Sequence, residues 1–198
     1  MSTNLSRAVS EAAEYLRARL PARPDLALVL GSGLGGLADR IEDPVYIPYD
    51  QIPHFPVSTA PGHAGRFVFG RLSGRMVLCM QGRFHYYEGH DMAAIALPVR
   101  VLKALGCRAL VLTNAAGGVN WDFSVGDFML IIDHINFMGA NPLRGENDDA
   151  IGPRFCDMTH VYTPEFQQTA RQVAPQQGIT LREGVYLGYM GPSFQTPA

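Results

Sequence analysis

Lysine is nearly absent from this 198-residue chain, in which Lys103 is the only one among 16 basic residues. The formal net charge is −2, so no basic excess favours nucleic acid or an anionic membrane as a partner. No apolar run approaches the roughly 20 residues that a membrane-spanning helix needs. The segment before Pro21 carries acidic residues instead of the apolar core of a signal peptide. We therefore expect a soluble, cytoplasmic protein that binds neither nucleic acid nor a membrane.

Cysteine is scarce as well, with only three residues in the chain. Their number is odd and their spacing is not that of a metal site. Cys79 and Cys107 lie in apolar runs, where we expect reduced core residues. The histidines of the central loops, namely His54, His63, His85 and His90, also lack the paired spacing of zinc ligands. The sequence therefore predicts no metal site.

The length allows one sizeable domain with a real core, and we predict a single domain over residues 1–198. Hydrophobic periodicity predicts helices and strands in alternation, which favours an α/β fold. The expected helices span 5–20, 91–105 and 163–177, and the expected strands span 25–30, 67–72, 75–81, 109–113, 128–134 and 184–189. Ser73 and Gly74 form the expected turn of a hairpin between the second and third strands.

Three of the expected strands are followed by groups that can bind an anion. Residues 31–36 form a glycine-rich turn that contains Ser32, and residues 83–89 bring arginine, histidine and a carboxylate. Residues 114–118 offer backbone amides without large side chains. Three strand ends with this chemistry point to an enzyme that handles a phosphate.

The glycine-rich turn alone also fits the G-x-G-x-x-G pattern of a dinucleotide site. Such a site needs an acidic residue about twenty positions on, after a second parallel strand. Asp50 lies near that distance, but the proline-interrupted segment 46–50 is a poor central strand. A tight strand-to-helix turn without a ligand is the other alternative. We favour a phosphate held by the turn amides and the Ser32 hydroxyl.

Three side chains support the phosphate interpretation. His63 lies among small residues on an open loop, which suits a lid over an anion. Arg83 and His85 are two residues apart, so on an extended segment they face the same way. The planar fork of Arg83 matches phosphate, and His85 can add a hydrogen bond.

Together these runs resemble the trimeric purine nucleoside phosphorylases. The resemblance is carried, in order along the chain, by residues 31–35, 52–56 with 61–65, 82–89, 114–118 and 191–194. It implies a central mixed β-sheet flanked by helices. It also implies phosphorolysis of purine (deoxy)ribonucleosides to free purine and (deoxy)ribose 1-phosphate, in purine salvage. No cofactor or metal is implied, since inorganic phosphate is a co-substrate.

The resemblance also implies residue roles. Phosphate would be held by Ser32, His63, Arg83, His85 and the backbone of Ala115. The nucleoside would be bound by Tyr87, Phe155, Phe194 and Gln195, with Phe155 reaching the site of a neighbouring subunit in a homotrimer. Glu88 would orient the phosphate and ribose ligands and would act with His85 in catalysis.

The chain departs from the family pattern at two places. Gln195 stands where the family has Glu, so the charge-assisted contact to N1–H and the 2-amino group of guanine would be lost. The chain ends at Ala198, where family members continue with strands and helices that carry further site residues, among them the asparagine at purine N7. We expect a polypeptide that ended here to fold poorly or to be inactive.

Two alternatives to a purine nucleoside phosphorylase stay open. A methylthioadenosine phosphorylase, which selects 6-aminopurines, is one, because the usual Glu is absent. An inactive truncated remnant that binds phosphate or nucleoside, or only oligomerises, is the other. A nucleotide-dependent oxidoreductase rests on the glycine pattern alone and is remote.

Overall fold

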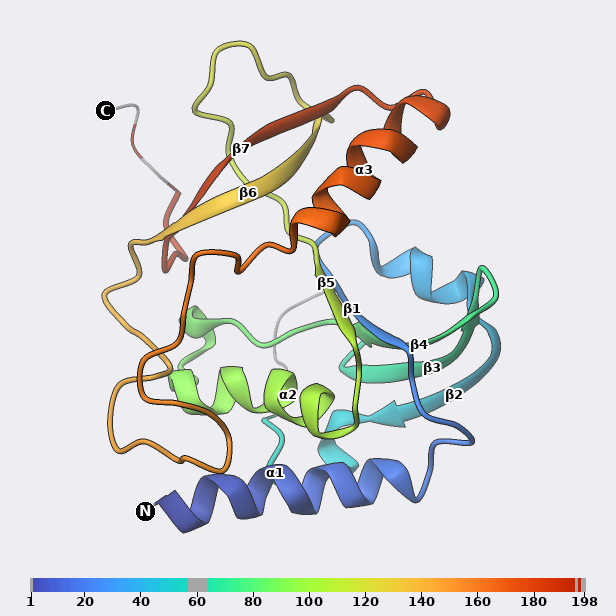
Figure 1. The fold of residues 1–198 in the computed structure, drawn as a ribbon, viewed down its shortest axis with the longest axis vertical. Helices are drawn as coiled ribbons and strands as arrows, with labels where there is room; N and C mark the ends of the chain where they lie inside the picture. Colours follow the sequence, from blue (N-terminus) through green and yellow to red (C-terminus); the bar gives the residue numbers. More distant parts are fainter. Residues whose placement is uncertain (1, 57–63, 195, 197–198) are drawn as a thin grey trace. The chain divides into compact units, whose positions relative to one another are not determined.

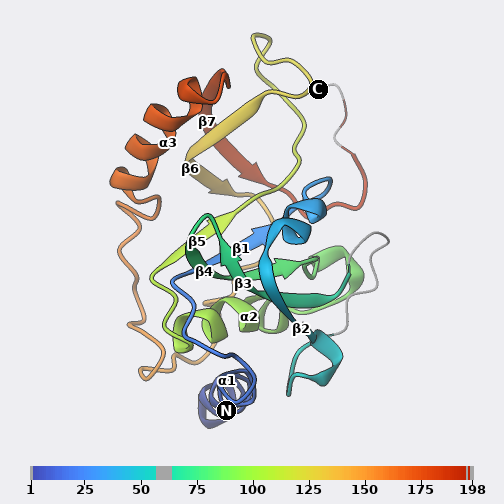
Figure 2. The same cartoon turned by 90° about the vertical axis from the view of Figure 1, so that its right-hand side faces the viewer.

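The computed structural model describes residues 2–56, 64–194 and 196, and it divides into two compact units. The first unit runs to Ala115 and includes Pro142–Pro153, and the second holds residues 116–141 and those from Arg154 onward. Figures 1 and 2 show the elements of each unit. Each unit is described by itself.

A five-stranded mixed sheet forms the centre of the first unit, as expected. Its spatial order is β2 (Glu42–Pro48), β3 (Arg66–Leu72), β4 (Arg75–Gln81), β1 (Leu26–Leu30) and β5 (Ala109–Leu112). β1 pairs in parallel with both β4 and β5, whereas β2, β3 and β4 are antiparallel neighbours. The hairpin of β3 and β4 turns at Ser73 and Gly74, which both have positive φ.

Alternating side chains of the strands build a core on each face of this sheet. Ala27 and Phe67 belong to the larger core cluster, which also contains residues of the two helices. Val68 and Cys79 belong to the other cluster with Ala38 of the short 3₁₀ helix η1 (Gly35–Arg40). Figure 1 shows both helices on one side of the sheet and η1 on the other. Burial on both faces explains the continuous apolar run of β1.

Both helices of this unit lie where the sequence predicts them, although the first begins and ends three residues before the predicted bounds. α1 (Ser2–Arg17) buries the stripe Val9, Ala12, Ala13 and Leu16, which share one face at helical spacing. α2 (Met92–Ala104) begins at Asp91, whose carboxylate accepts the Ala94 N–H at 2.7 Å. The helix continues through the buried Pro98 and is followed by Gly106 at φ +86°.

β2 is an edge strand, which accounts for its unpromising sequence. Its pairing with β3 shifts register between Glu42 and Val45, where Asp43 has φ +50°. Pro44 lacks an N–H for the ladder, and an edge strand with a bulge tolerates that loss. The expectation that this segment is no central strand is therefore confirmed.

An aromatic cluster lies beneath the end of β4. Tyr49, in the 3₁₀ turn η2 (Tyr49–Gln51), contacts the rings of Phe55, Phe67 and Phe84 with centroids 5.1–5.9 Å apart. Its hydroxyl donates a 2.8 Å hydrogen bond to the Gly82 carbonyl oxygen. The cluster therefore fixes the residue that precedes Arg83.

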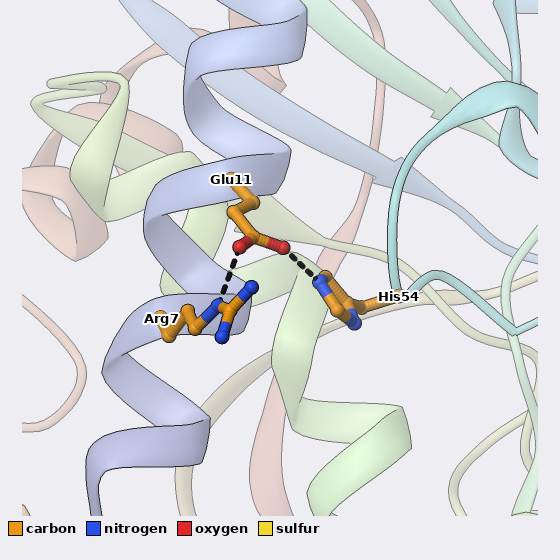
Figure 3. A network of polar contacts seen from close by, with 3 residues as sticks. All are labelled: Arg7, Glu11 and His54. Atoms are coloured by element: carbon orange, nitrogen blue, oxygen red, sulfur yellow. Dashed lines mark hydrogen bonds and ion pairs between the residues drawn. The ribbon is translucent and has the colours of Figure 1, made fainter.

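α1 is also tied to the loop after η2 by a polar network at the surface (Figure 3). One carboxylate oxygen of Glu11 accepts from Arg7 Nε at 2.6 Å, and the other lies 2.5 Å from His54 Nε2. His54 has φ +66°. The two contacts lower the pKa of Glu11, the His54 hydrogen bond contributing most.

The second unit contains a parallel pair of strands and one helix. β6 (Phe128–Asn136) pairs with β7 (Leu181–Gly188), and α3 (Pro164–Gln176) precedes β7 in the chain. Arg182 of β7 binds Asp127 at 3.0 Å, and Arg171 of α3 binds Glu183 at 2.7 Å. β7 begins three residues before the predicted start, because residues 181–183 pair with β6 although the charged Arg182 and Glu183 break the apolar pattern. In the described part of the chain, no helix has both the length and the apolar character needed to cross a membrane.

Candidate active site

The carboxyl ends of three parallel strands meet at one edge of the five-stranded sheet. In register, Leu30 of β1 lies opposite Gln81 of β4, and Val29 lies opposite Leu112 of β5. The residues that follow these strands therefore leave the sheet side by side. This edge is where open α/β sheets bind ligands.

Gly31 is the point of closest approach between these strand ends. A Cβ atom on Gly31 would lie 2.5 Å from the Thr113 carbonyl oxygen and 2.9 Å from Arg83 Nη1. The turn then closes with a 3.1 Å bond from the Leu34 N–H to the Gly31 carbonyl, and Gly33 takes φ +82°. The glycines are therefore required by the turn itself, and the turn leaves the Ser32 residue exposed.

The arrangement around Asp50 gives the dinucleotide alternative no support. Asp50 lies in η2, directly after the antiparallel edge strand β2. A dinucleotide fold places its acidic residue after a second parallel strand beside β1. The strands beside β1 are β4 and β5, and Asp50 follows neither of them.

Arg83 follows the end of β4 after Gly82, which has φ +101°. Its guanidinium Nη1 donates a 2.8 Å hydrogen bond to the Thr113 carbonyl oxygen, and the residue is half-buried. A guanidinium is planar, so one fixed N–H orients the whole fork. Phe84, the next residue, is 5 % exposed in the aromatic cluster, which anchors the segment between Arg83 and His85.

His85 and Glu88 form a nearly buried pair at the start of the 3₁₀ turn η3 (Tyr86–Glu88). Their side chains are 15 % and 3 % exposed. Glu88 Oε1 lies 2.8 Å from both the backbone N and the ring Nδ1 of His85. A carboxylate accepts hydrogen bonds, so this contact assigns the proton to Nδ1. The Tyr87 ring stacks on the imidazole, with centroids 4.7 Å apart and 16° between the planes.

The structure places the predicted site residues unevenly. Ser32, Arg83, His85 and Ala115 lie within a few residues of the three joined strand ends, and Asn114 and Ala115 are exposed in irregular backbone after β5. In the second unit, Phe155 and Phe194 are 89 % and 94 % exposed. His63 and Gln195 lie outside the described residues.

Two residues whose hydrogen bonds connect the strand ends at this edge of the sheet were not predicted from the sequence. Thr113 connects β1, β4 and β5, and Tyr49 holds the Gly82 carbonyl. Thr113 carried one signal, since it is a hydroxyl residue at the end of an apolar run. Tyr49 carried none, because its contact joins residues 33 positions apart.

The described cysteines and histidines do not form a reactive or metal-binding cluster. Burial raises the pKa of the Cys79 thiol to about 12 and that of Cys107 to about 11, so neither is a thiolate near neutral pH. Cys79 is buried, as expected of a core residue, whereas Cys107 is only half-buried, and both are free thiols. Across residues 2–56, 64–194 and 196, no three metal-ligating side chains lie together.

Comparisons with known proteins identify the family of this chain. The model of the phosphorylase superfamily matches residues 25–198. Purine nucleoside phosphorylase 1 of Geobacillus stearothermophilus is 54 % identical over 191 residues, which are 96 % of this chain and 70 % of that protein. The Bacillus subtilis protein of the same name is 52 % identical over 190 residues, with the same two shares covered.

A solved structure gives the same result at the level of the fold. The crystal structure of isoform 2 of purine nucleoside phosphorylase from Schistosoma mansoni, with cytosine and ribose-1-phosphate, matches with a TM-score of 0.91 and 44 % identity. The match covers 96 % of this chain and 69 % of that one. All three relatives carry the name purine nucleoside phosphorylase, so a methylthioadenosine phosphorylase is not favoured. The chain therefore belongs to the purine nucleoside phosphorylases of the phosphorylase superfamily.

Proposed function

We propose that this protein cleaves purine (deoxy)ribonucleosides with inorganic phosphate, giving free purine and (deoxy)ribose 1-phosphate. The observation that carries the proposal is the convergence of Ser32, Arg83 and Ala115 at three adjacent strand ends. Sequence similarity supports the proposal, since relatives more than 50 % identical are named for this activity. The solved relative with ribose-1-phosphate supports the class of product.

In this proposal the strand ends hold the phosphate. The Ser32 hydroxyl, the amide of Ala115 and the guanidinium of Arg83 would each donate to its oxygens. Because Nδ1 of His85 faces Glu88, His85 would contact phosphate through Nε2. The Glu88 carboxylate would orient the ring, and its charge would strengthen the hydrogen bond that holds it. His63 is proposed as a further phosphate ligand from the sequence alone.

The held phosphate then attacks the anomeric carbon. One phosphate oxygen forms a bond to C1′ while the bond from C1′ to the purine nitrogen breaks, and the purine leaves with that electron pair and is protonated. The sugar passes through an oxocarbenium-like state, which the adjacent negative phosphate stabilises. Fixing both reactants in line supplies the proximity contribution. The proposed reaction needs no cofactor or metal, since phosphate is a co-substrate.

The nucleoside side of the site rests on sequence motifs. Tyr87 would contact the ribose, Phe194 would pack on the purine and Gln195 would face its pyrimidine edge. Phe155 would complete the site of a neighbouring subunit in a homotrimer. We further propose that the enzyme acts in the cytoplasm in purine salvage.

The test is phosphorolysis of inosine by the full-length protein expressed from its gene. We expect uric-acid-coupled turnover that depends on phosphate, and a raised KM for phosphate in Arg83→Ala. The exposed Arg171→Ala, in the second unit, is the matched control and should leave that KM unchanged. Turnover without phosphate, or no turnover at all, would contradict the proposed function.

A further inference from the structure

We propose that Thr113 is the positioning residue that locks the three strand ends into one phosphate-binding arrangement. The inference rests on the proposed function, because it concerns the same phosphate. Thr113 itself is assigned no contact with substrate.

The side chain of Thr113 joins β5 to the end of β1. Its hydroxyl oxygen accepts the Gly31 N–H at 2.8 Å and donates to the Val29 carbonyl at 3.0 Å. Its backbone N–H also donates to Val29, at 3.1 Å. The hydroxyl thus extends the β1–β5 ladder by one residue, to the first glycine of the turn that carries Ser32.

The backbone carbonyl of the same residue joins β5 to the end of β4. It accepts the 2.8 Å bond from Arg83 Nη1. One residue therefore contacts the glycine turn through its side chain and the arginine through its main chain. The next two residues, Asn114 and Ala115, are the proposed source of backbone amides.

The packing around Gly31 shows that this junction has little freedom. Gly31 is buried, and a Cβ there would meet the Thr113 carbonyl oxygen, the Asn114 Cα and Arg83 Nη1 within 3 Å. A small displacement of Thr113 is thus passed to both neighbouring strand ends. Close packing makes such a junction sensitive to a single lost hydrogen bond.

The hydroxyl is the part of Thr113 that a substitution can remove. Valine has nearly the same shape, but it cannot accept the Gly31 N–H, and a buried donor without an acceptor is costly. The Val29 carbonyl keeps the Thr113 N–H. The damage from Thr113→Val should therefore centre on the turn that carries Ser32.

The test compares Thr113→Val with Thr113→Ser in the full-length protein. We expect Thr113→Val to raise the KM for phosphate about tenfold and the KM for inosine much less. Thr113→Ser keeps the hydroxyl and should retain most of the phosphate affinity. Thr169→Val, which removes an exposed hydroxyl bonded to the Glu165 carbonyl in α3, controls for the substitution itself.

Several outcomes would overturn the inference: an unchanged KM for phosphate in Thr113→Val, an equal rise of both KM values, or a Thr113→Ser variant as impaired as Thr113→Val. If Thr113→Val does not fold, Thr113→Cys replaces it, because a thiol is a weak acceptor, and the same order is expected.

Calorimetric titration with inorganic phosphate separates this inference from the proposed function. Wild-type turnover together with unchanged phosphate binding by Thr113→Val would overturn only the inference. If the wild type binds phosphate but shows no turnover, and Thr113→Val binds phosphate more weakly, the inference is supported and the proposed function is contradicted. A wild type that does not bind phosphate would overturn both.

Discussion

The hydroxyl of Tyr49 donates a 2.8 Å hydrogen bond to the carbonyl oxygen of Gly82, the residue between β4 and Arg83. Tyr49 is 1 % exposed, and burial raises the pKa of its phenol well above the ordinary value. The phenol therefore stays protonated and keeps its role as donor. The bond connects the aromatic cluster to the strand end that carries the proposed phosphate ligands.

Tyr49→Phe should lower the free energy of unfolding by about 1–3 kcal/mol, because the buried Gly82 carbonyl loses this donor. Urea unfolding followed by circular dichroism measures the change. Tyr46→Phe is the matched control, since Tyr46 is 47 % exposed on the edge strand, and it should stay within about 0.5 kcal/mol of wild type. Equal effects of the two substitutions would show that the buried bond contributes nothing.

Gly31→Ala should destabilise the protein and weaken phosphate binding, because the added methyl group would lie 2.5 Å from a backbone oxygen. We expect a loss of about 1–3 kcal/mol, as for other overpacked sites. Gly36→Ala offers the comparison, since the nearest atom to its methyl group would be Asp39 Oδ2 at 3.9 Å. Denaturant unfolding that ranks Gly36→Ala as the more damaging change would contradict this geometry.

Glu88→Gln should reduce kcat/KM at low phosphate concentration by roughly tenfold, since His85 loses its charged partner. The KM for phosphate should rise, and the KM for inosine should rise much less. Simple destabilisation would not produce this difference between the two KM values. Glu183→Gln breaks an exposed pair with Arg171 and should change neither quantity. An unchanged KM for phosphate in Glu88→Gln would contradict the proposed role.

The Glu11 network predicts a pH-dependent contribution to stability. Its contacts with His54 and Arg7 lower the pKa of Glu11 below the ordinary value of 4.5. A lowered pKa in the folded state stabilises the protein above the ordinary value, and this stability is lost as the pH falls through the lowered pKa. The Tm advantage of wild type over Glu11→Gln should therefore be present at pH 6 and should shrink below about pH 4.5. The effect should be small, because all three side chains are exposed.

A matched variant tests the origin of that dependence. The His54 hydrogen bond is the largest single cause of the Glu11 shift and the Arg7 hydrogen bond is the next, and His54→Ala and Arg7→Ala remove these donors one at a time. We expect His54→Ala to abolish at least as much of the acid-sensitive Tm difference as Arg7→Ala. The reverse order would mean that the ion pair within α1 dominates.

Gln195 predicts a weakened preference for guanosine. Glutamine can accept from the purine N1–H, but its own NH₂ group would oppose the 2-amino group of guanine. Gln195→Glu should raise kcat/KM for guanosine relative to inosine by about 10- to 100-fold. Xanthosine, which has an acceptor at C2, is the control substrate, and its kcat/KM should fall in Gln195→Glu. A strong guanosine preference in wild type that the substitution leaves unchanged would contradict the expectation.

Much of the fold could be predicted from local patterns. The periodic stripe of α1, the Asp91 cap of α2 and the Ser73–Gly74 hairpin each depend on neighbouring residues, so the sequence alone predicts them well. The sheet order and the edge position of β2 depend on pairing between distant segments, which periodicity does not encode.

The candidate site also has features that local sequence predicts and features that only the tertiary structure shows. The sequence by itself determined which residues can bind an anion, because glycine turns, arginine forks and small residues after strands have that chemistry wherever they fold. Only the tertiary structure decided that Thr113 joins the strand ends and that Glu88 is 3 % exposed against His85. The Thr113 contacts arise from the register of β1 between β4 and β5. Register is fixed by the packing of the whole sheet and not by any one motif.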